Sequence, residues 1–312
     1  MDAWIPITIL AAAAQTLRFV LQKQLKGVGL STAGATFARF VYSAPLAALM
    51  ALAYSGASGQ SLPQIPPVFW AYALSGGLTQ ILATMCVVAL FSHRHFAVGI
   101  TFKKTEVLLS VLVGLFVLGE GVSGLGLAAI LVGLGGVLLL SDPPGGDGDG
   151  DGGRDGGRGG AWHRRIWNRA AGLGLASGLF FAISGVGYRG ASLSLATGDT
   201  FQRAVVTLAC VTAAQVLAMT FWLLWRERGE ITRVLAAWRV AAGVGLASLV
   251  GSTCWFIAFT LQTVAYVNAL GQVELVFSLM AGVLIFGERL ARREWQGMAL
   301  LGASVLGLVL FA

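Results

Sequence analysis

The sequence has few charged residues: only 11% of its 312 positions are Asp, Glu, Lys or Arg. A soluble protein carries about 25%. The charge deficit, together with 56% hydrophobic residues and a mean hydropathy of +0.79, excludes both an ordinary soluble enzyme and a disordered chain. The chain is therefore expected to be an integral membrane protein.

Cysteine and enzyme signature motifs are also scarce. Cys86, Cys210 and Cys254 lie in apolar runs and predict neither a disulfide framework nor a metal site. The sequence contains no P-loop, no HExxH zinc motif and no G-x-S-x-G elbow. His93 and His95 flank a basic loop, where solvation explains them better than metal binding does. We therefore expect no enzyme activity, no cofactor and no metal.

Apolar runs make up most of the chain. A membrane-spanning helix needs about 20 residues, and turn or charge signals divide the sequence into two sets of five such runs. The first set covers about 4–22, 33–54, 68–91, 96–118 and 122–140. The second set covers about 166–187, 199–225, 236–261, 264–286 and 295–311. The sequence thus predicts an all-α integral membrane protein with ten transmembrane helices.

A segment rich in glycine and aspartate, residues 141–164, separates the two sets. Its first part, SDPPGGDGDGDGGRDGGRGG, has no apolar residue that could join a core, which favours a flexible linker. Calcium-binding repeats would need stacking apolar positions, and a dinucleotide site at its GxGxxG match would need a preceding strand. We therefore divide the chain into a five-helix unit at 1–140, the linker at 141–164 and a second five-helix unit at 165–312.

The two units repeat each other. Shifted by 168 positions, Trp70–Glu120 lies without a gap on Trp238–Glu288, with pairs such as Glu106 and Glu274 identical. Earlier, GATFARF matches GDTFQRA at a shift of 164, which pairs Arg39 with Arg203. Because five is odd, the second unit should cross the membrane in the opposite direction. Such inverted repeats are typical of secondary transporters with a site near the midplane.

The basic loop residues agree with this inversion. Equivalent loops of the two units differ in Lys and Arg content. On the predicted side of the membrane with fewer basic residues, the loops contain only Arg189. The richer side holds Lys23, Lys26, Arg94, Arg154, Arg158, Arg164, Arg165, Arg226, Arg228, Arg233, Arg289, Arg292 and Arg293. By the positive-inside rule this side is cytoplasmic. The linker is then cytoplasmic, both termini lie outside, and the basic pI needs no nucleic-acid partner.

Charges within the fourth span are the first candidates for a functional site. Lys103, Lys104 and Glu106 lie inside an apolar run, where a charge costs at least a few kcal/mol. The stripe of Glu106, Ser110 and Gly114 recurs as Glu274, Ser278 and Gly282, with Gln272 at the position of Lys104. The inverted symmetry predicts that Glu106 and Glu274 approach each other. The alternative is that each Glu only neutralises a basic neighbour and locks the bundle.

Arginines in the first, second and seventh spans differ in expected depth. Arg18 shares a helix face with Gln15 and Gln22 and lies deep enough to join the site. Arg39 and Arg203 come early in their spans, so we expect them near opposite membrane surfaces in a structural role. The candidate substrate-binding or coupling residues are Arg18, Lys103, Lys104, Glu106, Gln272 and Glu274. Their balance is positive, which suits a substrate with a carboxylate or phosphate.

The two halves resemble the drug/metabolite transporter superfamily, in its EamA-like branch. The resemblance rests on VLVGLFVLGE at 111–120, on LMAGVLIFGERLARREWQGMALLGASVLG at 279–307 and on the Arg of TFARF and TFQRA. It implies two EamA-like repeats and alternating access, and many members keep their termini inside, unlike the charge tally here. In Gly-Glu, Gly would end one helix and Glu would favour the start of the next, so Glu120 and Glu288 are expected to be structural.

The functional prediction is a secondary transporter that exports a small anionic or zwitterionic metabolite, coupled to protons or ions. The alternatives are a polyspecific exporter of cationic drugs and a non-transporting membrane scaffold. We expect a bacterial inner (plasma) membrane protein whose partners are its small-molecule substrate and the lipid bilayer. Both a monomer and a homodimer are compatible with the sequence.

Overall fold

A computed structural model describes residues 2–27, 29–90, 103–141, 169–277, 280 and 292–311. Within these residues every regular element is a helix. The first half contains α1 (Trp4–Gly27), α2 (Thr32–Val41), α3 (Ser43–Ser58), α4 (Pro67–Leu90), α6 (Glu106–Leu118) and α7 (Gly124–Ser141). The second half contains α9 (Arg169–Ser194), α10 (Thr200–Arg226), α11 (Glu230–Ala236), α12 (Trp238–Leu261), α13 (Val264–Gly271) and α15 (Arg292–Phe311).

The helices are apolar enough to cross a membrane. Among the described residues, six stretches meet the length and hydropathy that a span requires, with α2 and α3 counted together as Thr32–Ser58. The helices α6, α7, α13 and α15 contain shorter apolar stretches. Exposed leucines and phenylalanines, such as Phe116, Leu217 and Phe221, cover the outside of the bundle. An apolar exterior around a core that contains charged groups is the reverse of a soluble protein.

The second expected span differs from the prediction of one helix over 33–54. Its helix is interrupted at Tyr42, between α2 and α3. Pro45 has no N–H to donate to the carbonyl of Val41, so α2 ends there and Pro45 lies in the first turn of α3, where the missing N–H costs nothing. The hydroxyl of Ser43 donates to the carbonyls of Arg39 and Phe40 at 2.8 and 3.3 Å.

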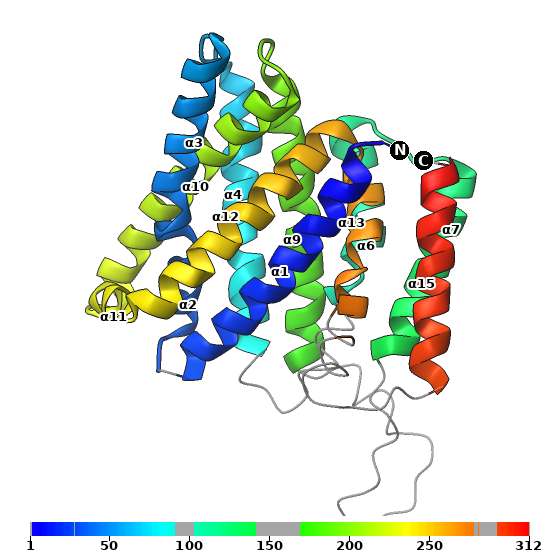
Figure 1. The fold of residues 1–312 in the computed structure, drawn as a ribbon. Coiled ribbons are helices and arrows are strands. Elements are labelled where there is room, and N and C mark those ends of the chain that lie inside the picture. The colour runs from blue at the N-terminus through cyan, green and yellow to red at the C-terminus, as the bar shows by residue number, and fades with distance from the viewer. Residues whose placement is uncertain are drawn as a thin grey trace, which may run out of the picture.

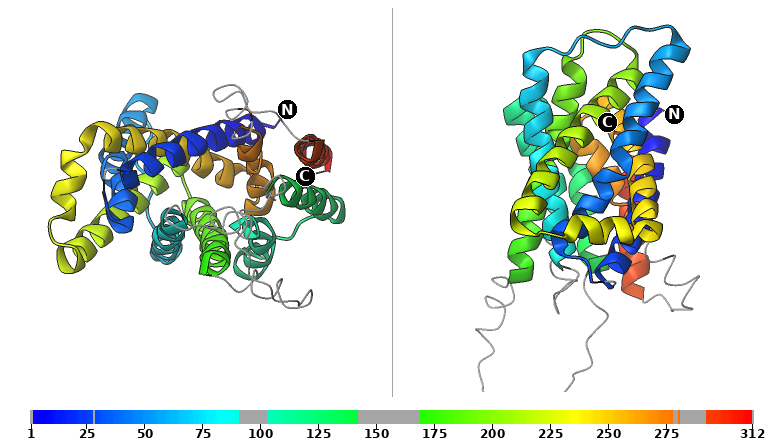
Figure 2. Two further views of the ribbon diagram at one scale, coloured as in Figure 1. Left: turned by 90° about the horizontal axis from the view of Figure 1, so that it is seen from below. Right: turned by 90° about the vertical axis from the view of Figure 1, so that its left-hand side faces the viewer.

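The helices pack in pairs drawn from the two halves of the chain. Helix α4 lies along α9, α1 along α12, α3 along α10 and α7 along α15. Figure 1 shows α1 and α12 crossing in front of α9, with α7 and α15 forming one side of the bundle. Seen from below, α7 and α15 lie together at one edge of the bundle (Figure 2).

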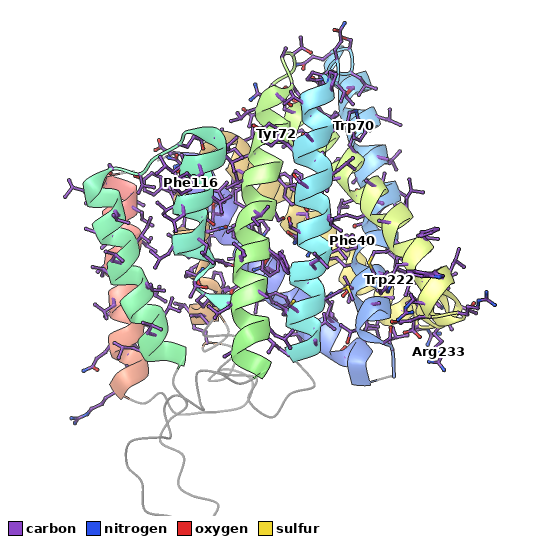
Figure 3. All side chains as sticks on the ribbon, turned by 180° about the vertical axis from the view of Figure 1, so that it is seen from behind. Phe40, Trp70, Tyr72, Phe116, Trp222 and Arg233 are labelled. Atoms are coloured by element: carbon purple, nitrogen blue, oxygen red, sulfur yellow. The ribbon has the colours of Figure 1, made fainter. Side chains whose placement is uncertain are left out.

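The two ends of the bundle differ in the segments that they carry. Both termini, the α3–α4 connection and the α9–α10 connection lie at the upper end in Figure 1. The end of α1, the start of α15 and the short helix α11 lie at the lower end. Arg233 of α11 is at this lower end in Figure 3, where Trp70 marks the other. The basic residues Arg226, Arg228 and Arg233 of this stretch therefore lie at the lower end. Of the linker, only Ser141 lies within the described residues.

Candidate functional site

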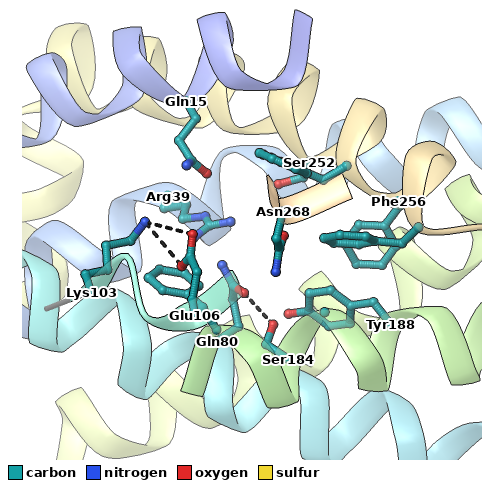
Figure 4. A pocket seen from close by; sticks show the side chains of 14 residues that line it. Gln15, Arg39, Gln80, Lys103, Glu106, Ser184, Tyr188, Ser252, Phe256 and Asn268 are labelled. Atoms are coloured by element: carbon teal, nitrogen blue, oxygen red, sulfur yellow. Dashed lines mark hydrogen bonds and ion pairs between the residues drawn. The ribbon is translucent and has the colours of Figure 1, made fainter. Parts of the chain in front are cut away.

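A small cavity lies in the middle of the bundle, between α1, α2, α4, α6, α9, α12 and α13. About 50 Å³ of it is open to the centre of a water-sized sphere, which is room for a few water molecules. Polar groups on its wall are Gln15, Arg39, Gln80, Lys103, Glu106, Ser184, Ser252 and Asn268 (Figure 4). Aromatic groups on its wall are Phe181, Tyr188, Trp255, Phe256 and Phe259. A larger solute needs the surrounding helices to separate.

Two lysines and two carboxylates form a buried ionic cluster beside the cavity. The Nζ of Lys103 lies 3.3 Å from Oε2 of Glu106 and 3.9 Å from Oε1 of Glu274. Lys104 forms an ion pair with Glu274. The predicted approach of Glu106 and Glu274 is thus observed, with Lys103 between them. Spacing explains the first pair, because residues three apart share a helix face.

Helix α1 holds this cluster from the other side. Gln15 donates from Nε2 to Oε2 of Glu274 at 2.7 Å. Its own oxygen accepts from Arg18 at 3.5 Å, and Arg18 also donates to Oε1 of Gln22 at 3.0 Å. Gln22 in turn donates to the carbonyl of Ala35 in α2 at 3.2 Å. Arg18 is therefore linked to the ionic cluster through Gln15, although it does not itself line the cavity.

Helix α13 and Gln272, which directly follows it, contribute a chain of amides. Gln272 donates to Oε1 of Glu106 at 3.4 Å and to the carbonyl of Asn268 at 3.1 Å. Asn268 donates to the hydroxyl of Ser110 at 2.8 Å, and Ser110 donates to the carbonyl of Glu106 at 2.6 Å. The replacement of Lys104 by Gln272 in the repeat thus gives Glu106 an uncharged partner where Glu274 has a lysine.

Of the six residues that the sequence singles out, Lys103 and Glu106 line the cavity. Arg18, Lys104, Gln272 and Glu274 lie behind them and are buried. Ser278 and Gly282 fall outside the described residues. In the described ranges no group of three His, Cys, Asp or Glu residues could hold a metal ion.

The expectation for Arg39 is wrong. Its side chain is 7% exposed and lines the cavity, instead of lying near a membrane surface. Helix α2 begins at Thr32, so Arg39 lies about 10 Å along the helix from its start, whereas Arg203 is only three residues from the start of α10. Arg203 is half-buried and is not part of the cavity wall.

Sequence reasoning also missed Gln80, Ser184, Tyr188 and Asn268. Each is a polar group inside an apolar helix, and this is the signal that could have found them. Tyr188 stacks on Phe256 with ring centroids 4.3 Å apart and accepts from Nε2 of Gln215 at 3.2 Å. Trp255 stacks in the same way on Phe259 at 5.6 Å.

In the Gly-Glu turn at 119–120, Gly119 ends α6 as predicted, whereas Glu120 lies four residues before the start of α7 and pairs with Arg189. Gly119 ends α6 in a left-handed conformation, with φ at 70°. The carboxylate of Glu120 binds Nε of Arg189 at 2.7 and 2.9 Å. Nη1 of Arg189 donates to the carbonyls of Phe259 and Gln262 at the end of α12, at 2.6 and 2.8 Å. Glu288 lies outside the described residues.

Comparisons with known proteins agree with this architecture. The model of the EamA-like transporter family matches residues 168–310. A Sinorhizobium sp. protein named "Uncharacterized transporter in cobO 3'region" is 35% identical over 112 residues, which are 36% of this chain and 75% of that protein. A solved structure named only "Crystal structure of protein" shares the fold, with a TM-score of 0.68 at 17% identity over 99% of this chain and 97% of that one.

A bundle of apolar helices around a polar, charged cavity defines an integral membrane protein of the transporter class. The chain belongs to the EamA-like transporter family, within the drug/metabolite transporter superfamily.

Proposed function

We propose that the protein is a secondary transporter that works by alternating access and exports a small anionic or zwitterionic metabolite. Glu106 and Glu274 are the proton- or cation-coupling groups. Lys103, Lys104 and Arg18 anchor the substrate, and Gln272 holds Glu106. The excess of positive charge buried around the cavity carries this proposal.

Among the described residues, the buried charges around the cavity do not cancel. Four are cationic and two are carboxylates: Arg18, Arg39, Lys103, Lys104, Glu106 and Glu274. A buried charge without a counter-charge is costly in a low-dielectric environment. An anionic group of the substrate would reduce this cost, whereas a second cation would increase it. The charge balance therefore favours the anionic or zwitterionic class over lipophilic cations.

Glu106 is suited to coupling because it lines the cavity and is paired with Lys103. If the substrate carries an ammonium group, that group competes with a proton for the Glu106 carboxylate. Competition of this kind exchanges protons for substrate across the membrane, which supports export driven by proton entry.

The packing of the helices supports two inverted repeats and ten spans, at 1–140 and 165–312, joined by the linker at 141–164. By their order in the two repeats, α1 corresponds to α9, α4 to α12 and α6 to α13. Exchanging each helix for its counterpart therefore converts the α1–α12 contact into the α4–α9 contact, and the α6–α9 contact into the α13–α1 contact. The pairs α3–α10 and α7–α15 each convert into themselves. A pseudo-twofold axis through the cavity produces this pattern.

Flux measurements test the proposed function. Proteoliposomes with the purified protein are screened with labelled amino acids and organic acids under an imposed pH gradient. We expect gradient-driven flux of at least one of these solutes, which Glu106→Gln uncouples from the gradient and Lys103→Ala abolishes. Arg228→Ala removes an exposed cation far from the cavity and should transport normally. Unchanged flux in the two cavity variants would refute the assignment, and absence of flux across the panel would favour the scaffold.

The charge tally supports a cytoplasmic linker and outside termini in a bacterial inner membrane. A reporter fused after Ala312 tests this orientation, because it should be active only on the outer side. A cytoplasmic signal would reverse the orientation without changing the site.

A further inference from the structure

The guanidinium of Arg39 is a buried cation whose hydrogen-bond partners are all neutral. Nε donates to the hydroxyl of Ser248 at 3.1 Å, and Nη1 donates to the hydroxyl of Thr84 at 2.9 Å. None of the ion pairs formed by the described residues includes Arg39. Its side chain lines the cavity (Figure 4), so a solute can reach the charge from inside.

Each of the other buried cations among the described residues differs from Arg39 in its hydrogen-bond partners, in its access to the cavity, or in both. Lys103 faces the cavity but is paired with Glu106, and Lys104 is paired with Glu274. Arg18 also has amide partners, but it does not line the cavity. Of the four buried cations among the described residues, only Arg39 both lines the cavity and has no paired carboxylate.

The amide of Gln80 occupies the place where a carboxylate would bind. In the orientation that satisfies both of its neighbours, its oxygen accepts from Nη1 of Arg39 at 2.8 Å and from Nη2 at 3.0 Å, and its nitrogen donates to Ser184. A carboxylate can bind the same two nitrogens with one oxygen on each, through stronger, charge-assisted bonds. Gln80 also lines the cavity, so an incoming carboxylate can displace its oxygen.

Aromatic side chains form the wall next to this position. Tyr188 and Phe256 are stacked with 28° between their planes, and Trp255 and Phe259 with 24°. Figure 4 shows Tyr188 and Phe256 beside Ser184 and Gln80. A flat apolar group packs well against such a wall.

We propose that Arg39 is the carboxylate-binding residue of the cavity, and that its ligand is a carboxylate with a flat apolar body. The Gln80 amide holds the place of the carboxylate and keeps the guanidinium fork oriented. The proposal rests on the proposed function, because it names the substrate class of the same cavity. It adds a second anchor, on α2, to the lysine anchor of the loop before α6.

Binding of benzoate and benzamide to the purified protein in detergent tests this proposal. The two probes have nearly the same shape, and only benzoate carries the charge. By calorimetric titration, with the shift of the melting temperature as a second readout, we expect benzoate to bind at least about tenfold more tightly than benzamide, since hydrogen bonds between charged groups are the stronger ones. Equal binding of the two probes, or no binding of benzoate, would overturn the proposal.

Three cavity variants and one control locate the site. Arg39→Gln should weaken benzoate binding by about ten- to a hundredfold, and Arg39→Lys by less because it keeps the charge without the fork. Gln80→Glu places a fixed carboxylate on the guanidinium, so it should keep the fold and lose the response to benzoate, even if Arg39→Gln fails to fold. The matched control is Arg203→Gln, the equivalent arginine of the second repeat, which should bind benzoate as the wild type does.

The outcomes separate this proposal from the proposed function. If Arg39→Gln and Gln80→Glu keep wild-type affinity while Lys103→Ala loses it, the anion anchor is Lys103 and the role of Arg39 is refuted. If the binding data follow the expectation but no solute crosses proteoliposomes, the carboxylate site stands and the transport function is refuted.

Discussion

Substituting Gly187 by alanine should weaken the contact between α4 and α9. A Cβ atom at Gly187 would lie 2.9 Å from both the Cα of Gly76 and the carbonyl oxygen of Tyr72. Both contacts are to backbone atoms, which cannot rotate away as a side chain can. The two helices would therefore have to move apart along a close interface that small residues make possible.

The size of the effect follows from two opposing terms. Overpacking of this kind costs about 1–3 kcal/mol, whereas alanine is favoured over glycine within a helix by about 1 kcal/mol. Gly302→Ala provides the control, because a Cβ there would meet nothing within 4 Å. Since the helix preference is common to both variants, their difference isolates the clash. Gly187→Ala should be less stable than Gly302→Ala by about 1–3 kcal/mol.

Thermal unfolding in one detergent, at fixed protein concentration, measures this difference. The wild type should melt between the two variants, or close to Gly187→Ala if the clash is at the low end of its range, and Gly187→Leu should melt lower still because its side chain is larger. If Gly187→Ala melts at or above the temperature of Gly302→Ala, the close contact does not hold the two helices together, and the predicted clash is refuted.

Two further predictions concern the upper end of the bundle. Arg189→Gln and Glu120→Gln should each destabilise the protein by about 1–3 kcal/mol, because the pair is partly buried and Arg189 also caps α12. A double-mutant cycle should show that the two effects are coupled. Additive effects would contradict this prediction. The pKa of Asp199 is lowered by the backbone N–H of Gln202 and the hydroxyl of Tyr54. Its stabilising effect is therefore complete above its ordinary pKa of about 3.9 and is lost as the pH falls through the lower pKa of the folded state. Melting curves from pH 7 down to 3 should show the wild type losing its advantage over Asp199→Asn only in the acid range.

Much of the fold could be predicted from the pattern of apolar runs and breaks. Apart from α11, the described helices overlap the expected runs, because a membrane requires long apolar segments and charged or turn residues end them, although α1, α3 and α9 extend several residues beyond the predicted ends. The interruption at Tyr42 and the short helix α11 were not predicted. The first follows from Pro45, and the second lies in what the sequence presents only as a basic loop.

The site was predicted in part. Charged residues inside an apolar run are easily recognised in the sequence, and the repeat relates Glu106 to Glu274. The ionic cluster could therefore be predicted. The polar side chains of α4 and α9 that line the cavity could not be predicted, because a helix that is apolar on all faces has no hydrophobic periodicity to indicate which face lies toward the cavity. The depth of Arg39 also depends on where α2 begins, which differs by one turn from its repeat.

The glycine contact between α4 and α9 has a consequence for how substrate range can change during evolution. Gly76 lies one turn from Gln80 on α4, and Gly187 lies three residues from Ser184 on α9. The same close approach that excludes a Cβ atom brings Ser184 within reach of Gln80. A mutation in this interface would alter both the stability of the bundle and the alignment of its polar wall. Relatives should therefore acquire new selectivity more easily through α12 and α13, on the opposite wall, than through α4 and α9.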